Sequence, residues 1–266
     1  MEHVLTSPSA SPRPRFRDLV LPKEHGSWSL AFEPLALSML AAPSLSGGLL
    51  ALAVASAFFC RRPLNIAMRD QRPERRAAAR EAALVCGVVT ALFFSGSIAL
   101  AGGAWTIWLV PSGLAGAIFL RFDLRNAGRE QLAEVAGSAA FGFLPAAMAV
   151  LAGWSEADAL ALAFVMVGRA VPTVLCVRAI LRGGKTGRHR PAFSLIAAWT
   201  ALAVAVLLAR DGLLPWVAAA LLALLALRAF ALLVFPRPAL RARTIGIIEA
   251  ATGVAFVVIA AAAWNG

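Results

Sequence analysis

Long apolar stretches recur along nearly the whole chain, and short segments that are basic or contain glycine and proline separate them. A helix needs about 20 apolar residues to cross the roughly 30 Å hydrocarbon core of a bilayer. The alternating segments of about 10 residues that are typical of a transmembrane β-barrel do not occur in this sequence. The pattern predicts an all-α, polytopic helical membrane bundle with about nine transmembrane helices, over residues 27–43, 46–60, 81–101, 104–121, 133–152, 157–177, 192–209, 213–234 and 245–264.

The first 22 residues do not fit this pattern. They are rich in serine, proline and arginine, and they lack the apolar core of a signal peptide. Such a composition is typical of segments that do not fold by themselves. We therefore expect a disordered cytoplasmic tail over residues 1–22, followed by a single transmembrane helical domain over residues 23–266.

The composition agrees with a membrane protein. Hydrophobic residues make up 60% of the 266 residues and charged residues only 15%, whereas soluble domains carry about 25% charged residues. The three cysteines, Cys60, Cys86 and Cys176, lie in or at the ends of apolar spans without the spacing of a metal site. We expect them to act as small packing residues.

The basic residues are unevenly distributed. Of the 25 lysines and arginines, 22 lie in the N-terminal tail and in the connections that follow the second, fourth, sixth and eighth spans. The positive-inside rule then places the N-terminus in the cytoplasm and the C-terminus outside. The net charge of +11 thus belongs to connections between spans, and we expect membrane lipids rather than nucleic acid as partners.

Among the ionisable residues inside predicted spans or near their ends, four are candidates for a site: Glu33, Glu134, Arg169 and Glu249. All four fall in the half of the membrane next to the basic connections. Buried charge in a bilayer is costly and usually functional, so their grouping favours a polar cavity on that side, in which Arg169 pairs with one of the glutamates. The alternative is that Arg169 extends to the interface and that Glu134 and Glu249 are interfacial.

The segment after the second span, residues 61–80, contains seven arginines. If it is helical after Pro63, the side chains of Arg62, Asn65 and Arg69 share one face, and Asp70 follows directly.

The segment after the sixth span, "VRAILRGGKTGRHR", places Arg178 and Arg182 one turn apart. We expect Gly183-Gly184 to break the helix and to leave Lys185 free to move. Together the two basic segments are suited to hold a phosphate or diphosphate. Alternatively, they only set the topology and contact anionic lipid headgroups.

The residues before the first span, Pro22-Lys23-Glu24-His25-Gly26-x-Trp28, include an acid and an imidazole at the membrane surface. His25 could act as an acid–base group, with Glu24 or Glu33 setting its protonation, which makes these three the candidate catalytic residues. The alternative is that Glu24 and His25 only cap and anchor the first span, as Trp28 does at the interface.

This opening motif resembles the start of the YwiC-like family of bacterial integral membrane proteins, whose members share a P-K-(E/Q)-H-G-x-W signature. Weaker similarities are the R-P-L turn after the second span, "QLAEVAG" at residues 131–137, and V-R-x-x-x-R after the sixth span. The resemblance implies a multi-pass protein of the bacterial inner membrane. It implies no chemistry, because the biochemical role of that family is not established.

The predicted layout is also similar to that of UbiA-type intramembrane prenyltransferases, in which Asp-rich motifs after the second and sixth spans hold magnesium and an isoprenyl diphosphate. Asn65, Asp70 and Arg72-Pro73 partly match the first motif, but no carboxylate lies between Asp158 and Asp211. Magnesium is therefore not expected. The resemblance implies a UbiA-like bundle that binds a phosphorylated lipid, with an isoprenoid as one candidate, and leaves open whether the protein is a prenyltransferase-like enzyme.

Two further interpretations remain open. In the first, Glu33, Arg169 and Glu249 form an ion- or proton-coupled path through a small transporter. That interpretation predicts polar groups up to the outer face and an inverted repeat, and the sequence has neither. In the second, the protein is a non-catalytic membrane assembly partner. The lipid-binding interpretation makes a separate structural prediction, which is the convergence on one cavity of Arg62, Asn65, Arg69, Asp70, Arg178 and Arg182. Its candidate substrate-binding residues are these six together with Arg169 and Lys185.

Overall fold

A computed structural model describes residues 15–21, 25–186, 192–235 and 242–265, and nearly all of them are helical. The side chains of residues 25–27, 183–186 and 242 are not described. The helices are α1 (Phe16–Val20), α2 (His25–Ala41), α3 (Leu45–Arg69), α4 (Pro73–Ala101), the 3-10 helix η1 (Ala104–Leu109), α5 (Val110–Asp123), α6 (Gln131–Gly142), α7 (Leu144–Leu151), α8 (Glu156–Thr186), α9 (Ala192–Arg210), α10 (Trp216–Val234) and α11 (Ala242–Asn265).

The all-α polytopic bundle predicted from the sequence is confirmed. Among the described residues, eight helical segments are long and apolar enough to cross a membrane, and Trp28–Ala41 within α2 is a shorter apolar helix. Two of the eight are composite. Residues 104–123 consist of η1 followed by α5, and residues 131–151 consist of α6 followed by α7. Pro111 and Pro145 each lie in the first turn of the second helix, where a missing N–H group is tolerated.

One local prediction was wrong, and two others gain detail. Within the predicted tail, α1 buries Leu19 and Val20 against α3 and α4. The segment after the second span is mostly helical, as the shared face of Arg62, Asn65 and Arg69 required, since α3 continues to Arg69 and α4 begins at Pro73. The predicted break at Gly183-Gly184 is absent, because α8 continues to Thr186. Arginine and alanine both favour helices, so the arginine-rich composition of these segments did not indicate loops.

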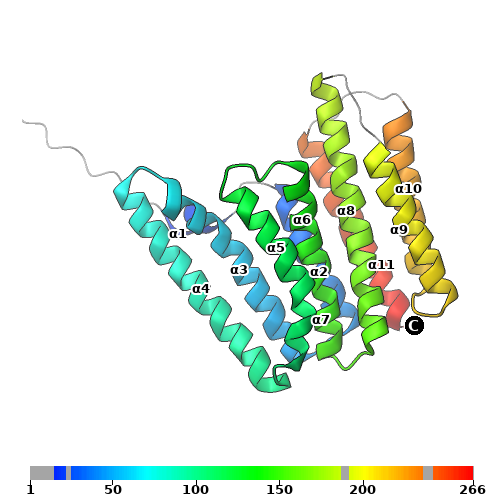
Figure 1. Ribbon diagram of the computed structural model, residues 1–266, viewed down its shortest axis with the longest axis horizontal. Helices are drawn as coiled ribbons and strands as arrows, with labels where there is room; N and C mark the ends of the chain where they lie inside the picture. Colours follow the sequence, from blue (N-terminus) through cyan, green and yellow to red (C-terminus); the bar gives the residue numbers. More distant parts are fainter. Residues whose placement is uncertain (1–14, 22–24, 187–191, 236–241, 266) are drawn as a thin grey trace, which may run out of the picture.

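Successive connections lie at opposite ends of the bundle (Figure 1). The α3–α4 turn, the α5–α6 connection and the C-terminal ends of α8 and α10 lie at one end, which we call the arginine end. The α2–α3, α4–η1, α7–α8 and α9–α10 connections lie at the other end, as does the C-terminal end of α11. This alternation is the arrangement that the positive-inside count assumed; which end faces the cytoplasm remains a prediction.

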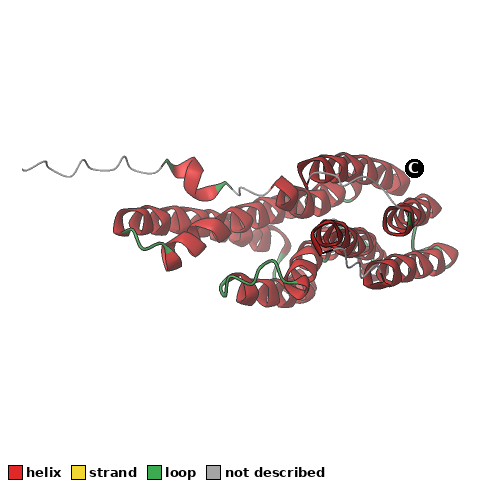
Figure 2. Ribbon diagram, turned by 90° about the horizontal axis from the view of Figure 1, so that it is seen from above, coloured by secondary structure: helices red, strands yellow, loops and turns green. Residues whose placement is uncertain are grey.

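The helices form two layers (Figure 2). One layer contains α4, α3, α2 and α11, and the other contains α5, α6, α7, α8 and α9. Helix α10 contacts α8, α9 and α11 and so connects the layers at one edge. Helix α2 lies inside the bundle, against α11, α7, α6, α3 and α8. This central position explains how a short helix with a carboxylate at Glu33 can be kept away from lipid.

The end of the bundle away from the arginine end has the larger apolar core. Its buried residues come from α2, α7, α8, α9, α10 and α11, and they include Leu37, Leu162, Met166, Leu222 and Phe256. Between other helices, small residues allow close approach, which is common in membrane bundles. At Gly142 on α6, an added Cβ would lie 2.9 Å from Val167 Cγ2 on α8.

Candidate functional site

Four charged side chains from four helices meet inside the bundle: Glu33 of α2, Arg169 of α8, Arg228 of α10 and Glu249 of α11. We call them the four-charge network. Arg169 Nε donates a hydrogen bond to Glu33 Oε2 at 2.8 Å, and Arg169 Nη2 lies 2.6 Å from the same oxygen. Arg228 donates through Nη1 and Nη2 to the two oxygens of Glu249, at 3.1 and 2.5 Å. The prediction that Arg169 pairs with a glutamate is confirmed, and the partner is Glu33.

The Glu33–Arg169 pair is the more enclosed of the two. The side chain of Arg169 is 3% exposed and that of Glu33 is 11% exposed. The Ser29 hydroxyl donates to Glu33, and the guanidinium of Arg169 lies 5.2 Å from the ring centre of Phe256. A charge-assisted hydrogen bond and an aromatic contact are the interactions that make a buried guanidinium tolerable.

Helix α11 makes room for this pair with a glycine. A Cβ added at Gly253 would overlap the carboxylate of Glu33, and it would lie 2.5 Å from Arg169 Nη2. Any side chain at this position would therefore have to displace the ion pair. The absence of a side chain at residue 253 is a requirement of the network.

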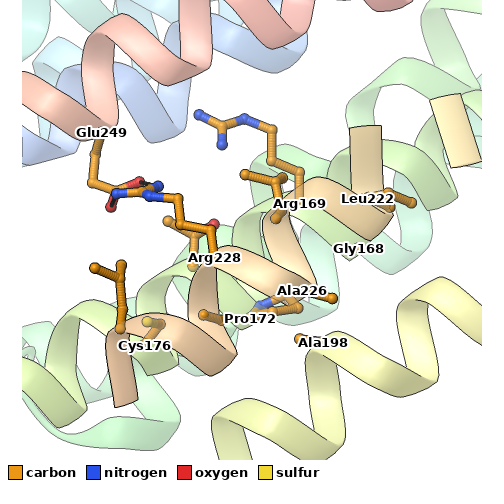
Figure 3. A pocket seen from close by; sticks show the side chains of 13 residues that line it. Gly168, Arg169, Pro172, Cys176, Ala198, Leu222, Ala226, Arg228 and Glu249 are labelled. Carbon is orange, nitrogen blue, oxygen red and sulfur yellow. Dashed lines mark hydrogen bonds and ion pairs between the residues drawn. The ribbon is translucent and has the colours of Figure 1, made fainter. Parts of the chain in front are cut away.

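The Arg228–Glu249 pair is more accessible and lies at a pocket. Its side chains are 26% and 14% exposed. The pocket is bounded by α8, α9, α10 and α11 and is lined by Arg169, Arg228 and Glu249 together with small and apolar residues, among them Thr173, Ala198 and Ala226. Figure 3 shows that the guanidinium groups of Arg169 and Arg228 both extend toward the side from which Glu249 reaches in. Within the described part of the chain, Arg169 Nη1 is buried and has no hydrogen-bond partner.

The network lies between regions of different polarity. On the side away from the arginine end, the same helices pack into the apolar core that contains Leu37, Leu162 and Met166. Toward the arginine end, the pocket follows α8 from Gly168 to Cys176 and α10 from Leu222 to Leu232. The charged groups are thus approached from one side and closed off on the other.

A second polar cluster, which we call the α3–α5 clasp, joins those two helices at the arginine end. Arg61 donates to both oxygens of Asp123 at 3.0 and 2.9 Å, and its guanidinium lies 4.6 Å from the ring centre of Phe119. Asn65 donates to Asp123 Oδ2 at 3.4 Å, and Arg69 donates to the Asp123 carbonyl at 3.2 Å. The predicted ligands Asn65 and Arg69 are therefore engaged in holding α3 to α5.

Two other predicted ligands of this segment have local partners. Arg62 donates to the carbonyl of Leu21. Asp70 accepts hydrogen bonds from Arg72 at 3.0 and 3.1 Å and from Arg75 at 2.9 Å. The hydrogen bonds from Arg72 lower the pKa of Asp70 to about 2. Asp70 thus organises the α3–α4 turn.

The second predicted basic segment belongs to a third cluster. Arg178 on α8 pairs with Glu134 on α6 and donates to the Arg129 carbonyl at 2.7 Å. Arg182, one turn later, is an exposed residue of the same helix. Among the described residues, Arg62, Asn65, Arg69 and Asp70 therefore have different partners from Arg178, and none of these five residues lines the pocket. These five residues thus do not gather at this pocket, and the convergence of the six predicted residues on one cavity stays a prediction.

Three predicted site residues lie outside what the structure describes. Glu24 falls in residues 22–24, and the side chains of His25 and Lys185 are not described, although these two residues lie in α2 and α8. The proposed acid–base role of His25 with Glu24 thus remains a prediction. The described residues contain no group of three or more histidine, cysteine, aspartate or glutamate side chains placed to hold a metal ion.

Sequence reasoning did not identify three residues that take part in these clusters: Arg228 in the four-charge network, and Arg61 and Asp123 in the α3–α5 clasp. Arg228 lies inside the predicted span 213–234 and satisfied the same criterion that selected Arg169, namely an ionisable group within an apolar run. Asp123 follows directly on the predicted span 104–121, but a single acid among arginines gave no signal of its own. Only the packing of α3 beside α5 reveals its role.

Comparison with known proteins finds a family similarity in the N-terminal part of the chain. Residues 21–149 match the family model described as YwiC-like protein, so the resemblance read from the opening motif is confirmed over this range. No curated protein and no solved structure matches the chain. The UbiA-like arrangement accordingly remains a prediction.

Proposed function

We propose that this chain, YwiC-like over residues 21–149, is a small ion- or proton-coupled membrane transporter whose coupling element is the four-charge network. The observation that carries the proposal is the meeting of two carboxylates and two guanidiniums from α2, α8, α10 and α11 inside the bundle. Helices that only face lipid and apolar neighbours do not need charged side chains inside the bundle in order to fold. Ionisable residues inside membrane bundles typically mark ion or proton pathways.

The network is suited to coupling because it is electrically balanced and divided into two pairs. Removing one charge from a buried pair leaves the other uncompensated, which is strongly unfavourable. Uptake of a proton or another cation by a carboxylate, or of an anion by a guanidinium, therefore changes the interactions that hold four helices together. A bound ion can in this way bias the arrangement of the bundle.

The one-sided position of the pocket supports the same function. Arg169, Arg228 and Glu249 line a pocket, and the apolar core closes the bundle beyond them. A carrier that alternates between two open states has this asymmetry in each state.

The interpretation as a phosphate-holding UbiA-like protein has less support. It requires the arginines of α3 and α8 to reach one ligand, whereas Arg61 and Arg69 bind Asp123 and Arg178 binds Glu134. No feature of the described residues favours the interpretation as an assembly partner.

The test is proton movement in proteoliposomes that contain a pH-sensitive dye. Anions, cations and neutral solutes are added in turn from outside. For wild type, at least one solute should change the lumenal pH faster than in empty liposomes. Arg169→Gln should abolish the change. The control is Arg210→Gln at the exposed end of α9, which should retain it. A wild type that moves protons with no solute, or an Arg169→Gln variant as active as wild type, would overturn the proposal.

A further inference from the structure

The two ion pairs of the four-charge network differ in a way that assigns them different tasks. Glu33 and Arg169 are enclosed by Ser29, Phe256 and the backbone at Gly253. Both members of the second pair, Arg228 and Glu249, line the pocket, whereas of the first pair only Arg169 does and Glu33 does not. The first pair is thus positioned to remain intact, and the second is positioned to exchange partners with a ligand.

We propose that the pocket binds one small monovalent anion, for which chloride is the probe, on Arg228 after Glu249 has taken up a proton. The proposal rests on the proposed function, since it uses the same network and names the ion that would accompany the proton. The only covalent change is the transfer of one proton. A proton moves from solvent to the Glu249 carboxylate, the carboxyl releases the guanidinium of Arg228, and the anion takes its place.

The charges around Glu249 support this exchange. The groups that face it are Arg228 on α10, Arg169 and Cys176 across the pocket on α8, and Glu33 on α2, which is bonded to Arg169. With both glutamates ionised the network has no net charge. Protonation of Glu249 leaves a net charge of one positive unit, and a single anion restores neutrality. Because an uncompensated charge in this interior is strongly unfavourable, proton and anion should bind together.

The donors and dimensions of the pocket point to a compact anion. Arg169 Nη1 is a buried donor without a partner in a side chain that is 3% exposed, and an anion beside Arg228 would supply an acceptor on that side of the pocket. Thr173 provides a hydroxyl in the same lining, while Ala198 and Ala226 make the opposite walls small and apolar. The space admits little more than a water molecule, which fits a monatomic ion and excludes a diphosphate or a sugar acid.

The experiment is isothermal titration of detergent-purified protein with sodium chloride in chloride-free gluconate buffer, at pH 5 and pH 8. Wild type should bind chloride at least ~10-fold more weakly at pH 8, because only the fraction with a protonated Glu249 is competent. Glu249→Gln, which mimics the protonated carboxyl, should bind equally at both pH values and at least as tightly as wild type does at pH 5. The double variant Glu249→Gln/Arg228→Gln should not bind, although it keeps the network neutral and should remain monodisperse.

Three results would overturn the proposal: wild-type binding that does not depend on pH, a folded Glu249→Gln variant that does not bind chloride, or a double variant that binds as well as Glu249→Gln. If the variants do not fold, the pH dependence of the wild type still decides. The titration needs no bilayer, so its failure is distinguishable from that of the proposed function. Chloride binding without solute-driven proton movement would refute transport, and movement without chloride binding would refute this site.

Discussion

Neutralising one member of the Glu33–Arg169 pair should destabilise the bundle more than neutralising both. The side chain of Arg169 is 3% exposed, and its Nη1 already has no partner among the described residues. Glu33→Gln would leave the guanidinium buried beside a neutral amide. Removing one partner of a buried ion pair costs about 3–5 kcal/mol. The retained amide oxygen can still accept one hydrogen bond, so we expect a loss near the lower limit, ~3 kcal/mol.

The double variant Glu33→Gln/Arg169→Gln removes both charges together. No uncompensated charge then remains, and replacement of a complete buried pair by neutral residues is often close to neutral. We therefore expect the double variant to be more stable than Glu33→Gln alone. The coupling energy between the two positions should lie near the upper end of the range of about 0.5–3 kcal/mol that is usual for residues in contact.

The assay is equilibrium unfolding in mixed micelles with increasing sodium dodecyl sulfate, followed by far-ultraviolet circular dichroism at pH 7. The matched control is Arg17→Gln, because Arg17 and Asp18 form a pair whose side chains are 72% and 60% exposed. That variant should lose less than about 1 kcal/mol. The reasoning is refuted if Glu33→Gln loses no more than the control, or if the double variant is less stable than Glu33→Gln.

Three further predictions concern other parts of the molecule. Gly253→Ala should lower the melting temperature and abolish proton movement, because its Cβ would overlap the buried pair. Gly246→Ala on the same helix should do neither, since no atom lies within 4 Å of the added Cβ. Equal effects of the two variants would contradict the geometry. The carboxyl carbon of Asp70 should titrate by nuclear magnetic resonance near pH 2, and Arg72→Gln should move the midpoint up toward 3.8. Because that pKa is lowered in the folded state, the contribution of Asp70 to stability is present above about pH 4 and is lost as the pH falls toward 2. A titration midpoint already near 3.8 in wild type would show that the hydrogen bonds from Arg72 do not form in solution. Alkaline phosphatase fused at the C-terminus should be active, since the positive-inside rule places this end outside, and an active fusion inserted instead at the α3–α4 turn would reverse the orientation.

The helices were predictable because the length of an apolar run is set by the thickness of a bilayer. Their ends were less predictable. Residues 61–69 and 178–186 are basic, and a basic composition was taken to indicate connections, yet both segments continue a helix. Arginine is a good helix former, so it marks the membrane surface without ending the helix. The true ends coincide with local signals, such as Pro73 at the start of α4 and Gly102, which has a φ of 73°, at the end of it.

The sequence predicted in which half of the membrane the charged residues of the candidate site lie, but not which residues form ion pairs. The sequence placed Glu33, Arg169 and Glu249 in the same half of the membrane, and in the structure they belong to one network. The partner of each depends on which helices are neighbours, and the hydropathy pattern does not contain that information. Glu134 illustrates the difference, because it lies at a similar position in its helix but binds Arg178 outside the network.

The distribution of the network along the chain bears on how the fold is assembled. Glu33 lies within residues 21–149, the part that matches the family model, whereas Arg169, Arg228 and Glu249 all lie beyond it. Glu33 is buried where α2 packs against α11 and α8, so its charge has no compensating guanidinium until the C-terminal half is in place. The glycine at residue 253 that admits the pair also belongs to that half. Because a carboxylate left alone in the membrane interior is strongly disfavoured, the N-terminal part should not reach its native packing alone. We therefore expect the N-terminal and C-terminal parts to fold as one unit, joined at Glu33.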